Sequence, residues 1–466
     1  MRTPVEATTA PFSALVRREW AAFRTRGRIV AMTCAALVHQ PLGPGGSITV
    51  RMTSMTGIIT YPPPDHDEIV PGLVPWAKAG IIVKDGLRQG SSYAALMVTG
   101  AHGVRMQHDY VHDTAGSPGG VSEGSPRWLR LTRSGDTITG HESADGTRWT
   151  EVGTARLAGL PETVQVGLFV TSPGDLTLRK VALGARIPES RFTQASATFD
   201  SISVAGAAGS SGGGWSRDAV GEMGHTDWEK YHRAAGLVES NGAFTVTGSG
   251  DIGPAGEEGH SLESHLFSLV ISLIIVLVVA VRFTTAGGAP LTGRVLAAKA
   301  VVAGSAAFLA GLVSAAVVMP LGTAILRADH ISVIPVSPLT GVRVAVAVGA
   351  LLGLAAAGGL ALRVLLRRAR AAILVVIAAL VLPYLMATLP LLPDEVSRWL
   401  LRVTPAAGFA VKQTLHEYPQ VLAHYAPSAG YFPLAWWAGF AVLCAYAAAL
   451  LILAARRLPR TGSTTA

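Results

Sequence analysis

The stretch LFSLVISLIIVLVVAV at residues 266–281 decides the fold, because it carries no charged side chain and no proline. Four further apolar runs follow it along the chain, at residues 295–326, 344–362, 371–392 and 434–454. Apolar runs of about 20 residues can cross the hydrocarbon core of a bilayer as helices. We therefore predict that residues 265–457 form a bundle of transmembrane helices.

A shorter apolar run lies near the N-terminus, at residues 29–38. As a helix it would be roughly 15 Å long, against a hydrocarbon core of about 30 Å. Residues 1–28 are predicted to form a basic amphipathic helix at the cytoplasmic membrane surface, because Trp20 and other apolar residues fall on one face. The short run is predicted to be a first span, which gives about six spans in total.

The distribution of basic residues predicts the orientation of the spans. With the N-terminus inside, the inside segments carry fifteen Arg and Lys residues and the short outside loops carry five. Basic residues collect in the cytoplasmic segments of membrane proteins. We predict a multi-pass plasma-membrane protein with cytoplasmic termini, a cytoplasmic tail at residues 458–466, and residues 39–264 outside the cell. The net charge of +8 comes largely from arginines that flank the apolar runs, so it does not predict a nucleic-acid partner.

Residues 39–204 have the pattern of an all-β domain. Short runs alternate apolar and polar residues or are rich in β-branched residues, and Gly, Pro, Asp and Ser separate them. This pattern predicts an extracellular β-sandwich, and residues 40–204 are expected to fold alone. Residues 205–264 are rich in Gly and Ser, which predicts a linker with one or two added strands near residues 243–247.

The sequence carries no recognisable cofactor or metal motif. No lysine lies in a Gly-rich loop before Ser or Thr, so no P-loop for a nucleotide is predicted. No metal site is predicted from the histidines near the strands, which are His108, His112 and His141. Carboxylates on the predicted hairpins make an extracytoplasmic glycosidase the lowest-ranked alternative: Asp109, Asp136, Glu142 and Asp145.

The predicted spans contain no Asp or Glu, and Lys299 is their only charged residue. Transporters driven by protons or ions usually carry acidic residues within the membrane. Energy for any uphill movement should therefore come from another polypeptide.

Several short motifs accompany the apolar runs: REW at residues 18–20, TT at 284–285, RVLAAK at 294–299, which opens the run at 295–326, and LRVTPAAGF at 401–409. With these motifs, residues 265–457 and the N-terminal helix resemble the transmembrane subunit of an ABC transporter of the type-2 exporter class, in its actinobacterial form. The resemblance implies a separate ATPase subunit, a homodimer or heterodimer of permeases, and short re-entrant helices within residues 393–433.

The cytoplasmic surfaces available for docking an ATPase are the N-terminal helix and the segment at residues 282–294. The N-terminal arginines could equally be solvated or bound to anionic lipid, worth about 1 kcal/mol each near the surface. The candidate docking residues are Arg17, Arg18, Trp20, Arg24, Thr284, Thr285 and Arg294.

Tryptophan and glycine motifs in residues 40–204 carry a second resemblance. They are WAKAG at residues 76–80, WLRL at 128–131, and Ser143, Asp145, Gly146 and Trp149 around a predicted tight hairpin turn. This part resembles the concanavalin-like or laminin-G-like sandwiches, which bind sugars or act as spacers.

The sequence thus predicts a non-enzymatic permease subunit of an ABC-type exporter. It would move an amphiphilic substrate, bind no cofactor itself, and use an ATPase supplied by another chain. The alternative is a membrane-anchored extracellular protein that binds or senses glycan, in which the helices serve only as an anchor. More spans than an anchor needs favour transport.

Overall fold

The computed structural model describes residues 35–61, 68–88, 90–207, 215–220, 235–253, 261–262, 266, 268–285, 291–328 and 336–458. The chain divides into two compact units. The first, called the β unit, takes Met1–Thr177, Glu189–Gly256 and Tyr418–Ala423. The second, called the helical unit, takes Leu178–Pro188, Glu257–Glu417 and His424–Ala466. The predicted N-terminal helix lies outside the described residues.

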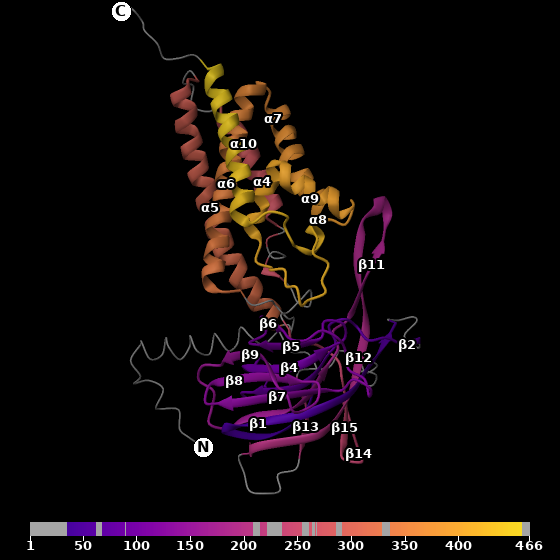
Figure 1. The fold of residues 1–466 in the computed structure, drawn as a ribbon. Helices are drawn as coiled ribbons and strands as arrows, with labels where there is room; N and C mark the ends of the chain where they lie inside the picture. The colour runs from indigo at the N-terminus through magenta and orange to yellow at the C-terminus, as the bar shows by residue number, and fades with distance from the viewer. Residues whose placement is uncertain are drawn as a thin grey trace, which may run out of the picture. The chain divides into compact units, whose positions relative to one another are not determined.

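The long strand β1 (Ala35–Thr60) belongs to both layers of the β unit (Figure 1). Its first part, up to Leu42, lies between β10 and β13, and its second part, from Gly45, lies between β7 and β12. The sequence Gly43-Pro44-Gly45-Gly46 separates the two parts. Gly46 is required there, because a Cβ at this position would lie 2.3 Å from the carbonyl oxygen of Ala205.

This strand corrects the predicted first span at residues 29–38. Residues 35–38 are extended and pair with β10, Ala36 opposite Val170 and Val38 opposite Leu168, while residues 29–34 lie outside the described part. The residues are apolar because Leu37 and Val38 are buried on opposite faces of one sheet layer. A strand buried on both faces has no alternation, so hydropathy alone cannot separate it from a helix.

All pairings in the β unit are antiparallel and form two layers that share β1. One layer has the order β13-β1-β10-β3-β4-β5-β6 and the other β9-β8-β7-β1-β12-β15-β14, with β2 on β1 and β11 on β12. The other strands are β2 (Ile69–Pro71), β3 (Lys78–Lys84), β4 (Tyr93–Thr99), β5 (Val104–His108), β6 (His112–Ala115), β7 (Arg127–Ser134), β8 (Thr137–Ser143), β9 (Thr150–Arg156), β10 (Val164–Thr171), β11 (Asp175–Lys180), β12 (Arg186–Ala207), β13 (Ser216–Val220), β14 (Gly236–Ser240) and β15 (Ala243–Gly248).

The main core lies between the layers and contains Ile48, Leu96, Leu131 and Val166. A second cluster covers the other face of the first layer, with Phe169 and Ile252 among its members. Strands β3 and β4 are consequently buried at every position. The β unit is therefore more than the predicted sandwich at residues 39–204.

Part of the predicted linker at residues 205–264 completes the β unit. It contributes β13 and β14 as well as β15, which lies where an added strand was expected. Residues 251–253 also pack on the first layer, where Asp251 pairs with the fully buried Lys78 and the Ile252 carbonyl accepts from the Tyr93 hydroxyl. Their small polar residues predicted a linker, but these segments join the β unit through main-chain hydrogen bonds rather than through large apolar side chains.

The turn predicted at Asp145–Gly146 is present, with Gly146 at φ +75°. The N–H groups of Arg148 and Thr147 donate to the Asp145 carboxylate at 2.9 and 2.8 Å, and these bonds hold the pKa of Asp145 well below its usual range. The ring that packs on this turn is Trp128. Trp149 is half-buried and stacks under the Arg130 guanidinium, 3.8 Å from its ring centre.

We expect Gly146→Ala to destabilise the β unit more than Gly135→Ala. Both glycines have positive φ, so both substitutions carry a backbone cost of about 1–2 kcal/mol. Only at Gly146 would the new Cβ meet a ring, 2.8 Å from Trp128, whereas at Gly135 it would meet open space. Thermal unfolding of the two variants, followed by tryptophan fluorescence, measures the difference. Equal losses would show that Trp128 moves away freely.

Four helices of the helical unit are long and apolar enough to cross a membrane, judged by length and composition over the described residues. They are α5 (Gly293–Ala328), α6 (Pro338–Leu366), the continuous run Ala369–Thr388 and α10 (Trp436–Arg457). The predicted run at 266–281 forms α4 (Leu269–Phe283), which is shorter at 15 residues. The prediction of about six spans is thus supported for four.

The run Ala369–Thr388 changes helix type halfway. It consists of α7 (Ala369–Val376), a π-helical turn η3 (Ile377–Val381) and α8 (Leu382–Thr388). Pro383 follows the π turn, and a proline has no N–H to donate to the preceding turn. The π turn is how the chain accommodates this proline.

Small residues bring α5 and α6 into close contact. A Cβ on Gly349 would lie 2.7 Å from the Phe308 carbonyl oxygen, and one on Gly353 would lie 2.9 Å from that of Gly304. Such small-residue pairs let helix backbones approach closely in membranes. The short helices expected in residues 393–433 are present as α9 (Asp394–Val403), η4 (Pro405–Lys412) and η5 (Pro427–Ala429).

Candidate functional site

The predicted docking residues of the helical unit lie where α4 ends and α5 begins. Lys299 donates to the carbonyl oxygens of Phe283 (3.0 Å) and Thr284 (2.9 Å). A cation is favourable at a helix C-terminus, and Lys299 caps α4 in this way. Thr284 is buried and donates to Ala280 O (3.3 Å), while Arg294 is exposed.

Thr285 is also exposed, and its hydroxyl donates to Arg282 O at 3.3 Å. Thr285 and Arg294 are therefore available to a partner, whereas Thr284 serves the fold. The other four predicted docking residues, Arg17, Arg18, Trp20 and Arg24, lie outside the described residues.

Other basic residues gather at the same end of the helical unit. Val281, Leu362 and Ala372 pack together, with Leu450 against them, which places the ends of α4 and α6 beside the start of α7. Arg457 donates to Leu365 O (3.1 Å), which adds the end of α10. We call this surface the basic end; residues 282–299, 363–370 and 454–458 carry nine Arg and Lys and no Asp or Glu.

Aromatic residues mark the start of α10. Trp437 is 63% exposed, and the Arg343 guanidinium lies 5.2 Å from the Trp436 ring centre. On α9, Trp399 is 58% exposed. Tryptophans collect at membrane interfaces, while arginines collect on the cytoplasmic side.

Lys412 is a buried cation that the sequence placed in an outside loop. It is 3% exposed on η4 and donates to the Tyr384 hydroxyl at 2.6 Å. The Tyr384 and Phe409 rings stack with centres 3.9 Å apart. The signal that could have revealed this burial is the apolar sequence PAAGFAV directly before Lys412.

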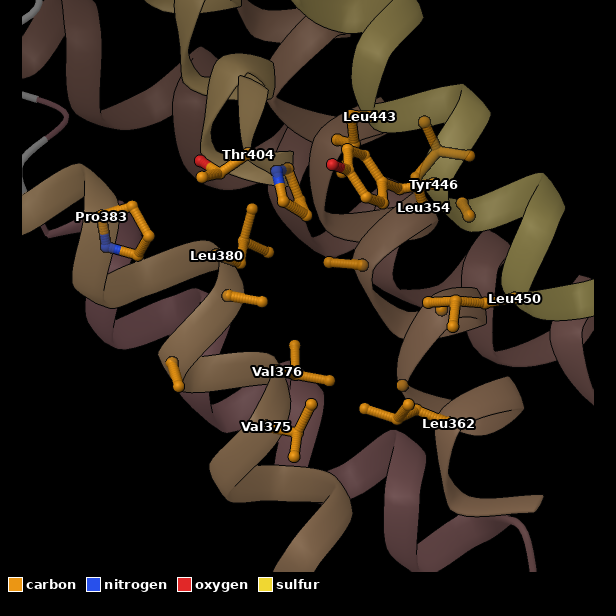
Figure 2. Close-up of a pocket in the computed structure, with 17 residues that line it drawn as sticks. Leu354, Leu362, Val375, Val376, Leu380, Pro383, Thr404, Leu443, Tyr446 and Leu450 are labelled. Atoms are coloured by element: carbon orange, nitrogen blue, oxygen red, sulfur yellow. The ribbon is translucent and has the colours of Figure 1, made fainter. Parts of the chain in front are cut away.

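An apolar cavity of about 360 Å³ lies within the helical unit (Figure 2). Its walls come from α6, from the α7–η3–α8 run, from the start of η4 and from α10. Figure 2 shows Val376 and Leu380 on one side of the space and Leu362 and Leu450 on the other. Sequence reasoning missed the cavity; Gly358-Gly359 and Pro383 were its only sequence signals.

The β unit places its candidate groups in structural roles. His108 and His112 stack across the β5–β6 hairpin with ring centres 4.4 Å apart. No grouping of His, Cys, Asp or Glu that could hold a metal occurs among the residues that the structure describes. Asp136 and Glu142 accept from the N–H groups of Gly159 (3.1 Å) and Ser117 (2.7 Å).

Lys84, at the end of β3, is the most perturbed cation of the β unit. It is 1% exposed, and its ammonium donates to the carbonyl oxygens of Arg88 (2.8 Å) and Ser91 (3.4 Å). Burial lowers the pKa of Lys84 to about 7, and the neighbouring Asp85 opposes this only in part.

No family model and no curated protein matches the sequence. Among solved structures, a functionally unknown protein from Saccharomyces cerevisiae is similar at 15% identity, covering 37% of this chain and 74% of that one (TM-score 0.23). SCP-B, a member of the eqolisin family of peptidases, is similar at 9% identity, covering 46% of this chain and 97% of that one (TM-score 0.27). The GH43 protein BlXynB from Bacillus licheniformis is similar at 13% identity, covering 35% of this chain and 28% of that one (TM-score 0.21). Likenesses this distant assign no function.

Proposed function

We propose that this chain is the permease subunit of an ABC-type exporter, inserted in the plasma membrane with its basic end in the cytoplasm and the β unit outside. The basic end carries this proposal. There Lys299 donates to the last carbonyl oxygens of α4, and Thr285 and Arg294 are exposed near it. Exposed polar side chains at a capped helix end are suited to docking a second protein.

The chain's chemistry supports an energy source on another polypeptide. The sequence has no nucleotide-binding motif, and the predicted spans contain no Asp or Glu. An ATPase bound at the basic end would supply the energy, and two permease chains would enclose the path of an amphiphilic substrate. The helical unit has a core of its own, from Leu273 on α4 to Leu443 on α10, which is more structure than an anchor requires.

An ATPase subunit should co-purify with the intact, tagged chain from native membranes in mild detergent. Arg294→Glu should reduce the amount recovered by about tenfold, since reversing one charge in an interface typically costs more than about 1.4 kcal/mol. Arg402→Glu is the matched control, because Arg402 is also exposed but lies on α9, away from the basic end. Quantitative mass spectrometry of the eluate measures the ratio.

Two outcomes would count against the docking model. If Arg402→Glu and Arg294→Glu lose the ATPase equally, docking is not at the basic end. If the wild-type chain recovers no ATPase, the exporter proposal fails. A membrane-anchored protein that binds glycan through the β unit then becomes the better account.

A further inference from the structure

The cavity of the helical unit is elongated along its helices. Its α6 wall extends from Leu354 to Leu362, which is about 12 Å at the rise of an α-helix. The opposite wall extends from Val375 to Pro383, and α10 adds Leu443 to Leu450. The space therefore runs along the helices rather than across them (Figure 2).

Backbone geometry and small side chains create this space. Gly358 on α6 has no side chain to fill it, and a Cβ there would meet only Leu450, at 3.9 Å. On the facing wall, Ala378 and Ala379 belong to the π turn η3. Single π turns are frequent at functional sites, because they displace one residue from the regular helix.

The polar groups of the walls are already bonded within the protein. The Tyr446 hydroxyl donates to Val403 O (2.7 Å), and the Thr404 hydroxyl donates to Leu400 O (2.7 Å). The other lining side chains are apolar, apart from glycines that have none. Water in such a space would find few partners, and an apolar cavity of about 150 Å³ already stays dry and binds hydrocarbon.

The cavity also reaches the surface of the helical unit. Val375 and Tyr446, both of which line it, are 45% and 42% exposed. In a bilayer these residues would face lipid, and a ligand could enter sideways from the hydrocarbon core. A volume of about 360 Å³ lies within the usual range of ligand sites, about 300–1,000 Å³.

We propose that this cavity binds one acyl chain of a membrane lipid, inserted along the helices between α6, the π turn and α10. The shape selects a linear chain over a compact molecule, and the bonded polar groups select hydrocarbon over a polar ligand. The inference needs only the insertion of the helical unit in a bilayer, which is one part of the proposed function. It does not depend on transport or on an ATPase.

The test uses the intact chain in nanodiscs of phosphatidylcholine that includes a fraction with a photoreactive diazirine on one acyl chain. After irradiation, peptides covering residues 375–383 and 443–450 should carry label in the wild type. In Gly358→Leu this labelling should fall about tenfold, because leucine occupies the volume that the chain needs. Label on α5, where Val301 and Leu309 are exposed, should not change.

Gly341→Leu is the matched control, since Gly341 lies on the same helix with no atom within 4 Å of its Cβ position. Ala447→Leu fills the cavity from α10 and should repeat the loss, so the result does not rest on one variant. Unchanged cavity labelling in both filling variants would overturn the proposal. So would a wild-type cavity wall that takes no label, which would leave a second copy of the chain as its occupant. Because no ATPase is present, neither result bears on the docking model.

Discussion

A fragment of residues 35–253 should unfold cooperatively as a soluble β protein, whereas residues 40–204 alone should not fold. The shorter fragment loses Leu37 together with Val220 and Ile252, which cover the outer face of the first layer. It also leaves the fully buried Lys78 without Asp251. Removing one partner of a buried pair costs about 3–5 kcal/mol, out of a domain stability of about 5–15 kcal/mol.

Circular dichroism and urea unfolding of both fragments measure this difference. Residues 35–253 with Asp251→Asn provide an intermediate case, because they keep the strands and remove only the charge that faces Lys78. Their transition should occur at lower urea than that of the unchanged fragment. If residues 40–204 gave the same transition as residues 35–253, the segments after residue 207 would be appendages and not part of the core.

The helical unit was largely readable from sequence, because long apolar runs have few alternatives. The run at 344–362 falls within α6, and α10 begins two residues after the start of the run at 434–454. The glycines at 349 and 353 were also visible, but their importance was not. Only the structure shows that Gly304 on another helix faces Gly353, and a single sequence does not reveal which helices are neighbours.

The sequence predicted that the β unit is an all-β domain, but it did not predict all of the segments that belong to it. Alternating strands such as β7 and β8 follow the period of two that hydrophobic patterning detects. Leu37, Val38 and strands β3 and β4 are buried on both faces of the layer, so they have no such period. Strand β13 contains Ser216, Arg217 and Asp218 and pairs by its main chain, so its composition resembled a linker.

The docking role of the candidate residues stays a prediction. Thr285 and Arg294 are exposed, and the capping of α4 by Lys299 depends on a tertiary contact that no local pattern contains. The cavity was invisible for a related reason. The cavity is the space that four separate segments leave unfilled, and no sequence motif indicates such a space.

Lys84→Met should stabilise the β unit at pH 7, and its advantage should disappear as the pH rises toward 10.5. The folded-state pKa of Lys84 is about 7, below its ordinary value of 10.5. Between these values the unfolded chain binds a proton that the folded chain does not, so wild-type stability rises with pH. The variant lacks this dependence. The difference in unfolding free energy between the variant and the wild type should therefore shrink by about 1.4 kcal/mol per pH unit, or by about 5 kcal/mol between pH 7 and pH 10.5.

Urea unfolding of residues 35–253 at several pH values measures this slope, with tryptophan fluorescence as the signal. Ile82→Met is the control, because Ile82 is equally buried on the same strand and its replacement introduces the same side chain without removing an amine. Its difference from wild type should not vary with pH, since other titrating groups cancel in the comparison. A flat difference for Lys84→Met would show that the ammonium remains charged in the fold, held by the carbonyl groups of Arg88 and Ser91.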